Sequence, residues 1–378
     1  MTYKRAWAEI SLSNLAHNLQ VITKNLKPNT RLMGIVKADA YGHGAPPVAH
    51  ALVNGGVGEL GVAICEEGIT LRESGITVPI LVMGFTPEPL LHEVVHLNLT
   101  QTVFSKSGAL LLAAQAARLN TRAAVHIKID TGMSRLGFLP NVESVQNICE
   151  IASNPNINVT GIYTHLATSD EPGSGFMFEQ LSRFKWVLDE LNKRGLDIPQ
   201  KHISNSGAFS HICTSEDYGD FYLDSVRVGI MLYGYPPSAE MADTCAPLGL
   251  RPVMRLMSRI SMVKELDAGV GISYGHIYKT TRKSTIAVLP IGYADGYPRR
   301  LSRGGRVLVN GHFAPIAGAI CMDQCMVDIT DAPNVNPDDP VIMMGEAGIC
   351  ADNLAEIVGT ISYEILCGIG KRVPRIYV

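Results

Sequence analysis

A lysine that directly follows a short apolar run is the first residue whose position suggests chemistry. Met33, Ile35 and Lys37 share one face if residues 33–36 form a strand, because successive side chains of a strand alternate. An ammonium group at the end of an apolar face is costly, and burial lowers its pKa. The resulting neutral amine is the nucleophile that forms a Schiff base. The alternative is a surface lysine, but the YGHG sequence at residues 41–44 favours a ligand, because glycine lets backbone approach closely.

Two further cations stand in similar positions. Lys128 alternates with apolar residues of the run 125–129 and shares a face with His126 and Asp130, and Arg135 follows shortly after. A structural pair of Lys128 with Asp130 is the alternative interpretation. Arg227 points away from its apolar neighbours in the same way, and because arginine keeps its proton it needs an acceptor. An aromatic ring nitrogen or an internal carboxylate would serve.

The same part of the chain offers donors for a phosphate group. The segments SNSG at residues 204–207 and RVGIML at 227–232 follow apolar runs, and backbone N–H groups in such loops bind phosphate. The natural donors are Ser206, Gly229 and Ile230, with the hydroxyl of Tyr41 in addition.

Alternating strand and helix patterns supply the elements that must position these residues. The expected strands share short apolar runs and lie at residues 33–36, 60–64, 80–83, 100–104, 125–129, 158–164, 201–204 and 226–230. Helical periodicity covers residues 12–26, 108–119 and 178–194. Eight strand–helix units in about 235 residues predict a (β/α)8 TIM-type barrel, an α/β fold whose functional residues follow the strands.

The pattern changes after residue 235. Short β-branched runs at residues 254–263, 284–289, 306–309, 325–329 and 340–343 alternate with turns rich in glycine and proline. Such a pattern predicts a smaller, mainly antiparallel β domain. We therefore expect a barrel over residues 1–240 and a mainly-β domain over 241–378.

Composition excludes several classes of function. The net charge of −3 gives no basic surface for nucleic acid or for an anionic membrane, and no apolar stretch is long enough for a membrane span. The N-terminus lacks the apolar run of a signal peptide, since Glu9 interrupts it, so we expect a cytoplasmic protein. Cys321 and Cys325 have no second pair at metal spacing, and we expect no metal site.

The motifs together resemble the alanine racemase family over nearly the whole chain. The resemblance runs from RAWAEISLSNLAHN at residues 5–18 through VKADAYGHG, ISYGH, PIGYADGYPRR and GAICMDQCMVD to RVPRI at 372–376. It implies an enzyme that depends on pyridoxal 5'-phosphate, interconverts L-alanine and D-alanine and supplies D-alanine for cell-wall peptidoglycan. It also implies a head-to-tail homodimer that shares its active sites.

The resemblance assigns roles to individual residues. Lys37 holds the cofactor and is one catalytic base, on the face of the D-enantiomer, and Tyr274, from the partner subunit, is the other, on the L face. The residues implied in holding the cofactor are Tyr41, His165, Ser206, Arg227, Gly229, Ile230 and Tyr363. The residues implied around the substrate are Arg135, Met322 and Asp323, with Tyr293 at the entrance and Lys128 at a position that is carbamylated in many members. Arg227 is expected on the pyridine nitrogen, with His165 bonded to it.

Two other functions fit part of this pattern. A decarboxylase of basic amino acids has a similar barrel and β domain, but it should place an acid at the ring nitrogen. A non-catalytic carrier of pyridoxal phosphate would share Lys37 and have no use for a second domain with Tyr274.

Overall fold

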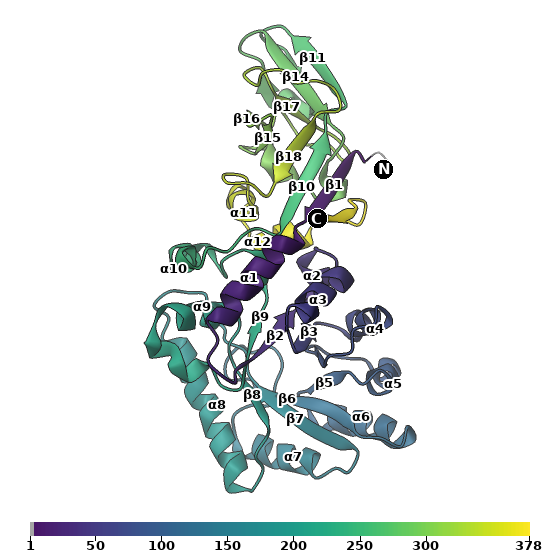
Figure 1. Ribbon diagram of the computed structural model, residues 1–378, viewed down its shortest axis with the longest axis vertical. Coiled ribbons are helices and arrows are strands. Elements are labelled where there is room, and N and C mark those ends of the chain that lie inside the picture. Colours follow the sequence, from purple (N-terminus) through teal and green to yellow (C-terminus); the bar gives the residue numbers. More distant parts are fainter. Residues whose placement is uncertain (1–3) are drawn as a thin grey trace.

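Eight parallel strands close into a barrel in the first part of the chain (Figure 1), and the computed structural model describes residues 4–378. The strands follow one another around the barrel in sequence order, and the last pairs with the first. They are β2 (Arg31–Ile35), β3 (Glu59–Val62), β4 (Ile80–Val82), β5 (Thr100–Val103), β6 (Ala123–Lys128), β7 (Ile157–Tyr163), β8 (Gln200–His202) and β9 (Ser225–Val228). Each of the eight barrel strands expected from the apolar runs is confirmed.

Helices surround the barrel. Those that follow strands are α2 (Lys37–Tyr41), α3 (Ala45–Asn54), α4 (Cys65–Glu73), α5 (Leu91–His96), α6 (Lys106–Arg118), α7 (Val142–Ala152), α8 (Phe176–Lys193) and α9 (Ser206–Thr214), with the short turns η1 (Glu88–Leu90), η2 (Glu216–Phe221) and η3 (Ile230–Tyr233). Helix α1 (Leu12–Lys24) precedes the first strand, begins at the cap Ser11 and buries Leu15, Leu19 and Ile22. It packs against α3 and η3, and so fills the place of a helix after β9.

The rest of the chain is mainly β-structure. A six-stranded sheet contains, in spatial order, β16 (His312–Pro315), β15 (Arg306–Val309), β18 (Pro340–Met344), β10 (Met254–Arg259), β1 (Ala6–Ile10) and β19 (Arg375–Tyr377). Smaller sheets join β11 (Met262–Leu266), β14 (Ser284–Leu289) and β17 (Cys325–Asp328), and β12 (Gly271–Ile272) with β13 (Tyr278–Lys279). The helical segments here are η4 (Ala239–Met241), α10 (Ala242–Cys245), η5 (Ala246–Leu248), η6 (Tyr274–His276), η7 (Tyr293–Asp295), η8 (Arg299–Ser302), α11 (Ala351–Val358) and α12 (Ser362–Cys367).

Two details of the β-structure differ from the apolar pattern. The expected single run 254–263 is wrong, because the chain changes sheets within it: the N–H of Ile260 donates to Asp339 O near the large sheet, whereas that of Ser261 donates to Val288 O of β14. Strand β1 was not expected at all. It pairs antiparallel with β10 and parallel with β19, so the chain begins in the sheet of its C-terminal part. The division at residue 240 stays a prediction.

None of the helices in residues 4–378 has both the length and the apolar composition needed to cross a membrane.

Candidate active site

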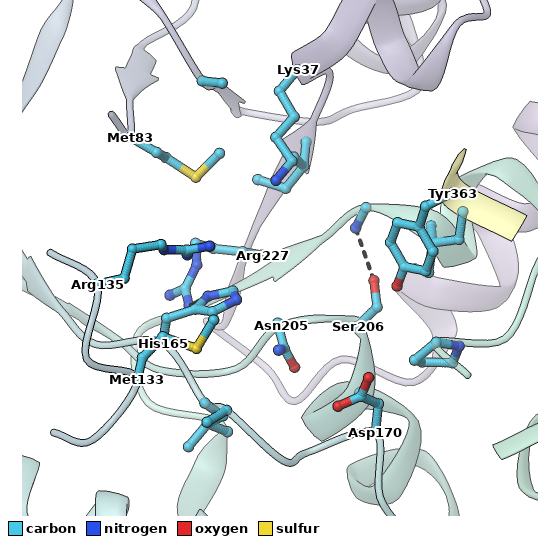
Figure 2. A pocket seen from close by; sticks show the side chains of 18 of the residues that line it. Lys37, Met83, Met133, Arg135, His165, Asp170, Asn205, Ser206, Arg227 and Tyr363 are labelled. Atoms are coloured by element: carbon cyan, nitrogen blue, oxygen red, sulfur yellow. Dashed lines mark hydrogen bonds between the residues drawn. The ribbon is translucent and has the colours of Figure 1, made fainter. Parts of the chain in front are cut away.

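The carboxyl ends of the barrel strands surround a cavity of about 580 Å³ (Figure 2), within the usual size range for small-molecule sites. Its lining includes ten of the residues that the sequence singled out: Lys37, Tyr41, Lys128, Arg135, His165, Ser206, Arg227, Gly229, Ile230 and Tyr363. Four of these are cations or titratable amines, and Asp170 is the one acid among the lining residues in the described chain. The cavity is therefore suited to an anionic ligand.

Lys37 opens a segment of unusual backbone. The four residues that follow it, Ala38 to Tyr41, all have φ of 53° or 54°, so α2 is a left-handed turn. This conformation costs roughly 1–2 kcal/mol for each residue other than glycine. Strain of this size is retained where function needs it. Burial lowers the pKa of the Lys37 amine, and the nearby charge of Arg135 lowers it further.

Lys128 lies inside the barrel, as its alternation predicted, and only 6% of its surface is exposed. Burial, followed by the charges of Arg227 and Arg135, lowers its pKa well below the usual value. Its Nζ lies 4.2 Å from the ring centroid of Tyr163, a cation–π contact when the amine is charged. No ion pair joins Lys128 to Asp130 in the part of the chain that the structure describes, so the structural alternative for this lysine is not supported.

Asp130 instead organises the loop that carries Arg135. Its carboxylate accepts the backbone N–H groups of Gly132, Ser134 and Arg135 at 3.0, 2.9 and 3.1 Å. Ser134 adopts a φ of 55°, a left-handed conformation that these three hydrogen bonds hold in place. The loop directs Arg135 into the cavity (Figure 2).

Arg227 is held by neutral acceptors. Its Nη1 donates to Nδ1 of His202 at 2.7 Å, and its Nη2 donates to the carbonyls of Thr164 and Ile203, both at 2.9 Å. A longer bond of 3.3 Å joins Nη2 to Nδ1 of His165, the contact expected from the resemblance. Burial lowers the pKa of Arg227 to about 10, so the guanidinium keeps its charge at neutral pH.

A second histidine extends this network through the barrel. Because Nδ1 of His202 accepts from Arg227, its Nε2 carries the proton and donates to Nδ1 of His126 at 2.9 Å. Burial and the charge of Arg227 hold the pKa of His202 well below its usual range, and burial lowers that of His126 to about 3. Both rings are thus neutral, and neither compensates the charge of Arg227.

The opposite end of the cavity gathers hydroxyl and backbone N–H groups that can donate to an anion. Ser206 is the first residue of α9, and the N–H of Gly229 donates to its Oγ at 3.0 Å. A Cβ on Gly229 would lie 2.4 Å from the hydroxyl of Tyr41, so only glycine leaves room for this approach. The helix N-termini, the hydroxyls and the backbone N–H groups are what an anion requires. The donors at this end would therefore suit the phosphate group of pyridoxal phosphate.

Four of the expected site residues lie elsewhere. Tyr274, Tyr293, Met322 and Asp323 are absent from the lining of this cavity, and Tyr274 contributes to a separate one with the arginines of η8. Tyr274 is 72% exposed, Met322 54% and Tyr293 43%. One chain therefore does not bring Tyr274 to Lys37.

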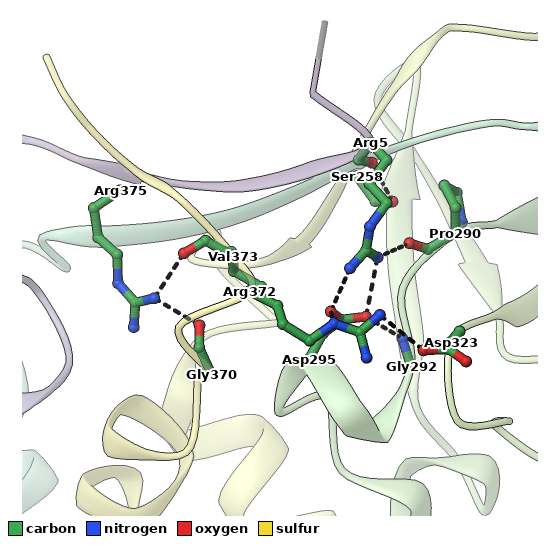
Figure 3. A network of polar contacts seen from close by, with 10 residues as sticks. All are labelled: Arg5, Ser258, Pro290, Gly292, Asp295, Asp323, Gly370, Arg372, Val373 and Arg375. Atoms are coloured by element: carbon green, nitrogen blue, oxygen red, sulfur yellow. Dashed lines mark hydrogen bonds and ion pairs between the residues drawn. The ribbon is translucent and has the colours of Figure 1, made fainter.

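An ion network around the buried Asp295 joins the segments that carry Tyr293 and Met322 (Figure 3). The side chain of Asp295 is fully buried and accepts two hydrogen bonds from Arg5, of 2.6 and 3.1 Å, and one from the N–H of Gly292. Arg372 lies 3.4 Å from the same carboxylate and also donates to Asp323 at 2.8 Å. Burial, the largest single influence, raises the pKa of Asp295, but the hydrogen bonds from Arg5 and Gly292 and the charges of Arg5 and Arg372 together lower it below the usual value.

Sequence reasoning missed several residues of this site. Tyr163 and His202 stack inside the barrel with centroids 4.6 Å apart, and Glu67 bonds to the turn after Lys37. Tyr163 ends β7 and His202 ends β8, so the rule that functional residues follow barrel strands would have found both. Glu67 lies on a helix, and only the folded structure reveals its contact.

Comparison with known families and proteins agrees with this architecture. Residues 10–237 match the family described as "Alanine racemase, N-terminal domain", and residues 253–377 match "Alanine racemase, C-terminal domain". The chain is 48% identical to the alanine racemase of Halothermothrix orenii over 374 residues, covering 98% of this chain and 96% of that protein. It is 44% identical to alanine racemase 1 of Clostridium acetobutylicum, covering 98% and 95%. The solved alanine racemase of Clostridium difficile 630 superposes with a TM-score of 0.94 at 43% identity, covering 100% and 97%.

Proposed function

The chain belongs to the alanine racemase family, and from this membership we propose how its residues interconvert L-alanine and D-alanine. The activity is that of an alanine racemase, and the family depends on pyridoxal phosphate. One observation supports the residue assignment most directly: ten expected residues line one cavity, whereas Tyr274 is 72% exposed outside it.

We propose that pyridoxal phosphate binds in this cavity with its phosphate at Ser206, Gly229, Ile230 and Tyr41. When bound to an amino acid, this cofactor withdraws electrons from the α-carbon and makes its proton easier to remove. The lowered pKa of Lys37 favours the neutral form of the amine, which is the form that would bond covalently to the cofactor. Tyr363, which contacts Tyr41 at a ring-centroid distance of 5.9 Å, covers the same end.

Arg227 determines which chemistry the site favours. No carboxylate is among its hydrogen-bond partners in residues 4–378, so its guanidinium would donate to the ring nitrogen of a bound cofactor and would keep that nitrogen unprotonated. This weakens the electron sink and limits side reactions at the cost of rate. The decarboxylase alternative requires an acid here, and a carrier has no need of this control.

Two bases on opposite faces carry out the racemisation in this proposal. A racemase removes the α-proton from one face and returns a proton to the other, which two opposed bases achieve without movement across the cofactor. Lys37 Nζ exchanges the proton on the D face and Tyr274 Oη on the L face. Arg135, directed into the cavity by Asp130, holds the substrate carboxylate, together with backbone groups of Met322 and Asp323.

The second base reaches the cavity from another subunit. The exposed Tyr274, Tyr293 and Met322 form part of the surface that a partner covers, and a head-to-tail homodimer completes both sites at once. Tyr293 then lies at the substrate entrance.

We also propose a cytoplasmic location with a role in supplying D-alanine for peptidoglycan. All eight cysteines are unpaired thiols, which agrees with a reducing compartment.

Lys128 is the proposed site of carbamylation. Its lowered pKa favours the neutral amine, the form that reacts with carbon dioxide. The product replaces a buried cation with an anion, which holds Arg135 by charge-assisted hydrogen bonds.

Subunit complementation tests the shared site. Lys37→Ala and Tyr274→Phe are each expected to be nearly inactive, and a mixture that exchanges subunits should regain about a quarter of wild-type activity, because half the dimers hold one intact site of two. Racemase activity is measured by incubation with L-alanine in D2O, as loss of optical rotation together with uptake of deuterium at the α-carbon. Absence of activity in mixtures whose exchange is verified by mass spectrometry would refute the shared site.

A further inference from the structure

The left-handed turn after Lys37 is anchored at its start by a residue from another helix. Glu67, in the first turn of α4, accepts the backbone N–H of Ala38 on Oε1 at 2.5 Å. Its Oε2 accepts the N–H groups of Ala63 at 2.7 Å and Ile64 at 3.4 Å, just after β3. One carboxylate thus ties the loops after the first two barrel strands together.

The far end of the turn is held by different groups. Asp39 Oδ1 accepts the N–H of Ala45 at 2.7 Å, where α3 begins. Arg375 of β19 donates to Gly42 O at 2.9 Å and to carbonyls of its own C-terminal segment. Neither group touches the peptide that joins Lys37 to Ala38.

The peptide that joins Lys37 to Ala38 affects how the lysine is oriented. The first N–H groups of a helical turn have no partner within it, and here the N–H of Ala38 finds one in Glu67. The angle ψ of Lys37 is the rotation about the bond between its Cα and this peptide, so a peptide held in place restricts how the Cα and its side chain are oriented relative to it. A strained turn keeps such an orientation only when contacts outside it impose one.

We propose that Glu67 is a positioning residue for Lys37, which fixes the peptide after the lysine so that its amine meets the cofactor in a single orientation. This inference rests on the proposed role of Lys37 as the residue that bonds to the cofactor. The charge of Glu67 also acts on the amine, because it raises the pKa of Lys37 against the lowering by burial and by Arg135.

Glu67 has a second role that the test must separate. Its bond to the N–H of Ile64 caps α4, and the loss of such a cap lowers stability by itself. Asn141 provides a matched control, because its side chain caps α7 through the N–H of Ser144 at 2.9 Å and has no contact with the turn. Glu66, exposed in the same turn of α4, is the control for removing a nearby charge.

The experiment measures the dissociation constant of pyridoxal phosphate by absorbance, and the melting temperature, for Glu67→Ala, Glu67→Gln, Asn141→Ala and Glu66→Ala. Glu67→Ala is expected to weaken binding by about tenfold or more, the scale of losing a hydrogen bond to a charged group. Glu67→Gln keeps one acceptor and should weaken binding of pyridoxal phosphate by about three- to tenfold. The test therefore holds even if the alanine variant does not fold. Asn141→Ala should lower the melting temperature without weakening binding, and Glu66→Ala should resemble wild type.

Unchanged binding in both Glu67 variants would overturn the proposal, as would equal weakening in Asn141→Ala. These results differ from a failure of the proposed function, in which the wild-type protein itself would not bind pyridoxal phosphate or Lys37→Ala would retain the same absorbance.

Discussion

The guanidinium of Arg227 donates a 2.7 Å hydrogen bond to Nδ1 of His202, and this bond determines the protonation of the barrel interior. Since an arginine only donates, Nδ1 of His202 must accept. The single N–H of that ring is therefore on Nε2, and it donates a hydrogen bond to His126. A charged arginine therefore lies against neutral histidines, and its charge remains available to a ligand in the cavity.

Arg227→Glu should raise transamination relative to racemisation. An acid at this position lets the ring nitrogen keep a proton, which strengthens the electron sink and favours side reactions. Racemisation itself should fall by about a hundredfold, the scale of losing one charged donor. Pyruvate formation and loss of optical rotation measure the two reactions, with Arg227→Lys as a control that preserves charge. Unchanged partitioning would contradict the role assigned to Arg227.

Acid should destabilise the protein below pH 6.5 through its buried histidines. The pKa of His126 is lowered to about 3, while the unfolded chain binds that proton near 6.5. The stability contributed by the neutral ring is therefore complete above pH 6.5 and is lost as the pH falls toward 3, by about 1.4 kcal/mol per pH unit. His126→Asn, which keeps an acceptor toward His202, should lower the slope of unfolding free energy against pH by about one proton. Urea denaturation at pH 7, 6 and 5 measures the unfolding free energy of both proteins. Parallel plots of this free energy against pH for wild type and His126→Asn would argue against a neutral His126.

Gly229→Ala should weaken cofactor binding while the fold is retained. The added Cβ would lie 2.4 Å from the hydroxyl of Tyr41, which must then move away from the proposed phosphate site. We expect binding of pyridoxal phosphate to weaken by about tenfold, as for the loss of one charge-assisted hydrogen bond. The double variant Gly229→Ala with Tyr41→Phe should bind better than Gly229→Ala alone, because it lacks the displaced oxygen. A double variant that binds worse would show that the clash is not the cause.

Asp295→Asn should destabilise the C-terminal domain. The carboxylate is fully buried between Arg5 and Arg372, and its loss leaves Arg5 without its carboxylate partner, whereas Arg372 keeps Asp323. Because both arginines are partly exposed, water screens them, and we expect a loss of about 1–3 kcal/mol in the free energy of unfolding. Asp331→Asn, which breaks the exposed pair with Arg282, is the control and should leave stability nearly unchanged. Equal effects of the two substitutions would be inconsistent with a special role for the buried network.

Most of the fold could be predicted from the sequence, because barrel strands bury both faces and appear as short apolar runs. The run at residues 100–104 became β5, and the runs at 284–289 and 306–309 became β14 and β15 with the expected bounds. Strand β1 was not predicted, since residues 6–10 acquire partners only from β10 and β19, at the other end of the chain.

The candidate site could be predicted where the chemistry is carried by residues at strand ends. Lys37 and Ser206 follow apolar runs, and alternation within runs placed Arg227 and Lys128 inside the barrel. Glu67 and Asp295 could not be found in this way. A glutamate in the first turn of a helix and an aspartate in a glycine-rich turn are ordinary residues until folding brings a distant N–H or arginine against them.

The sequence by itself determined the barrel, the family motifs and the residue types of the cavity, because periodicity and motifs are local properties of the chain. Only the tertiary structure decided the left-handed turn after Lys37, the neutral histidines behind Arg227 and the separation of Tyr274 from the cavity. Each of these depends on contacts between residues far apart in sequence, whose energies outweigh local preference. Lys37 therefore owes its chemistry to its own position after a strand, and its orientation to Glu67 thirty residues away.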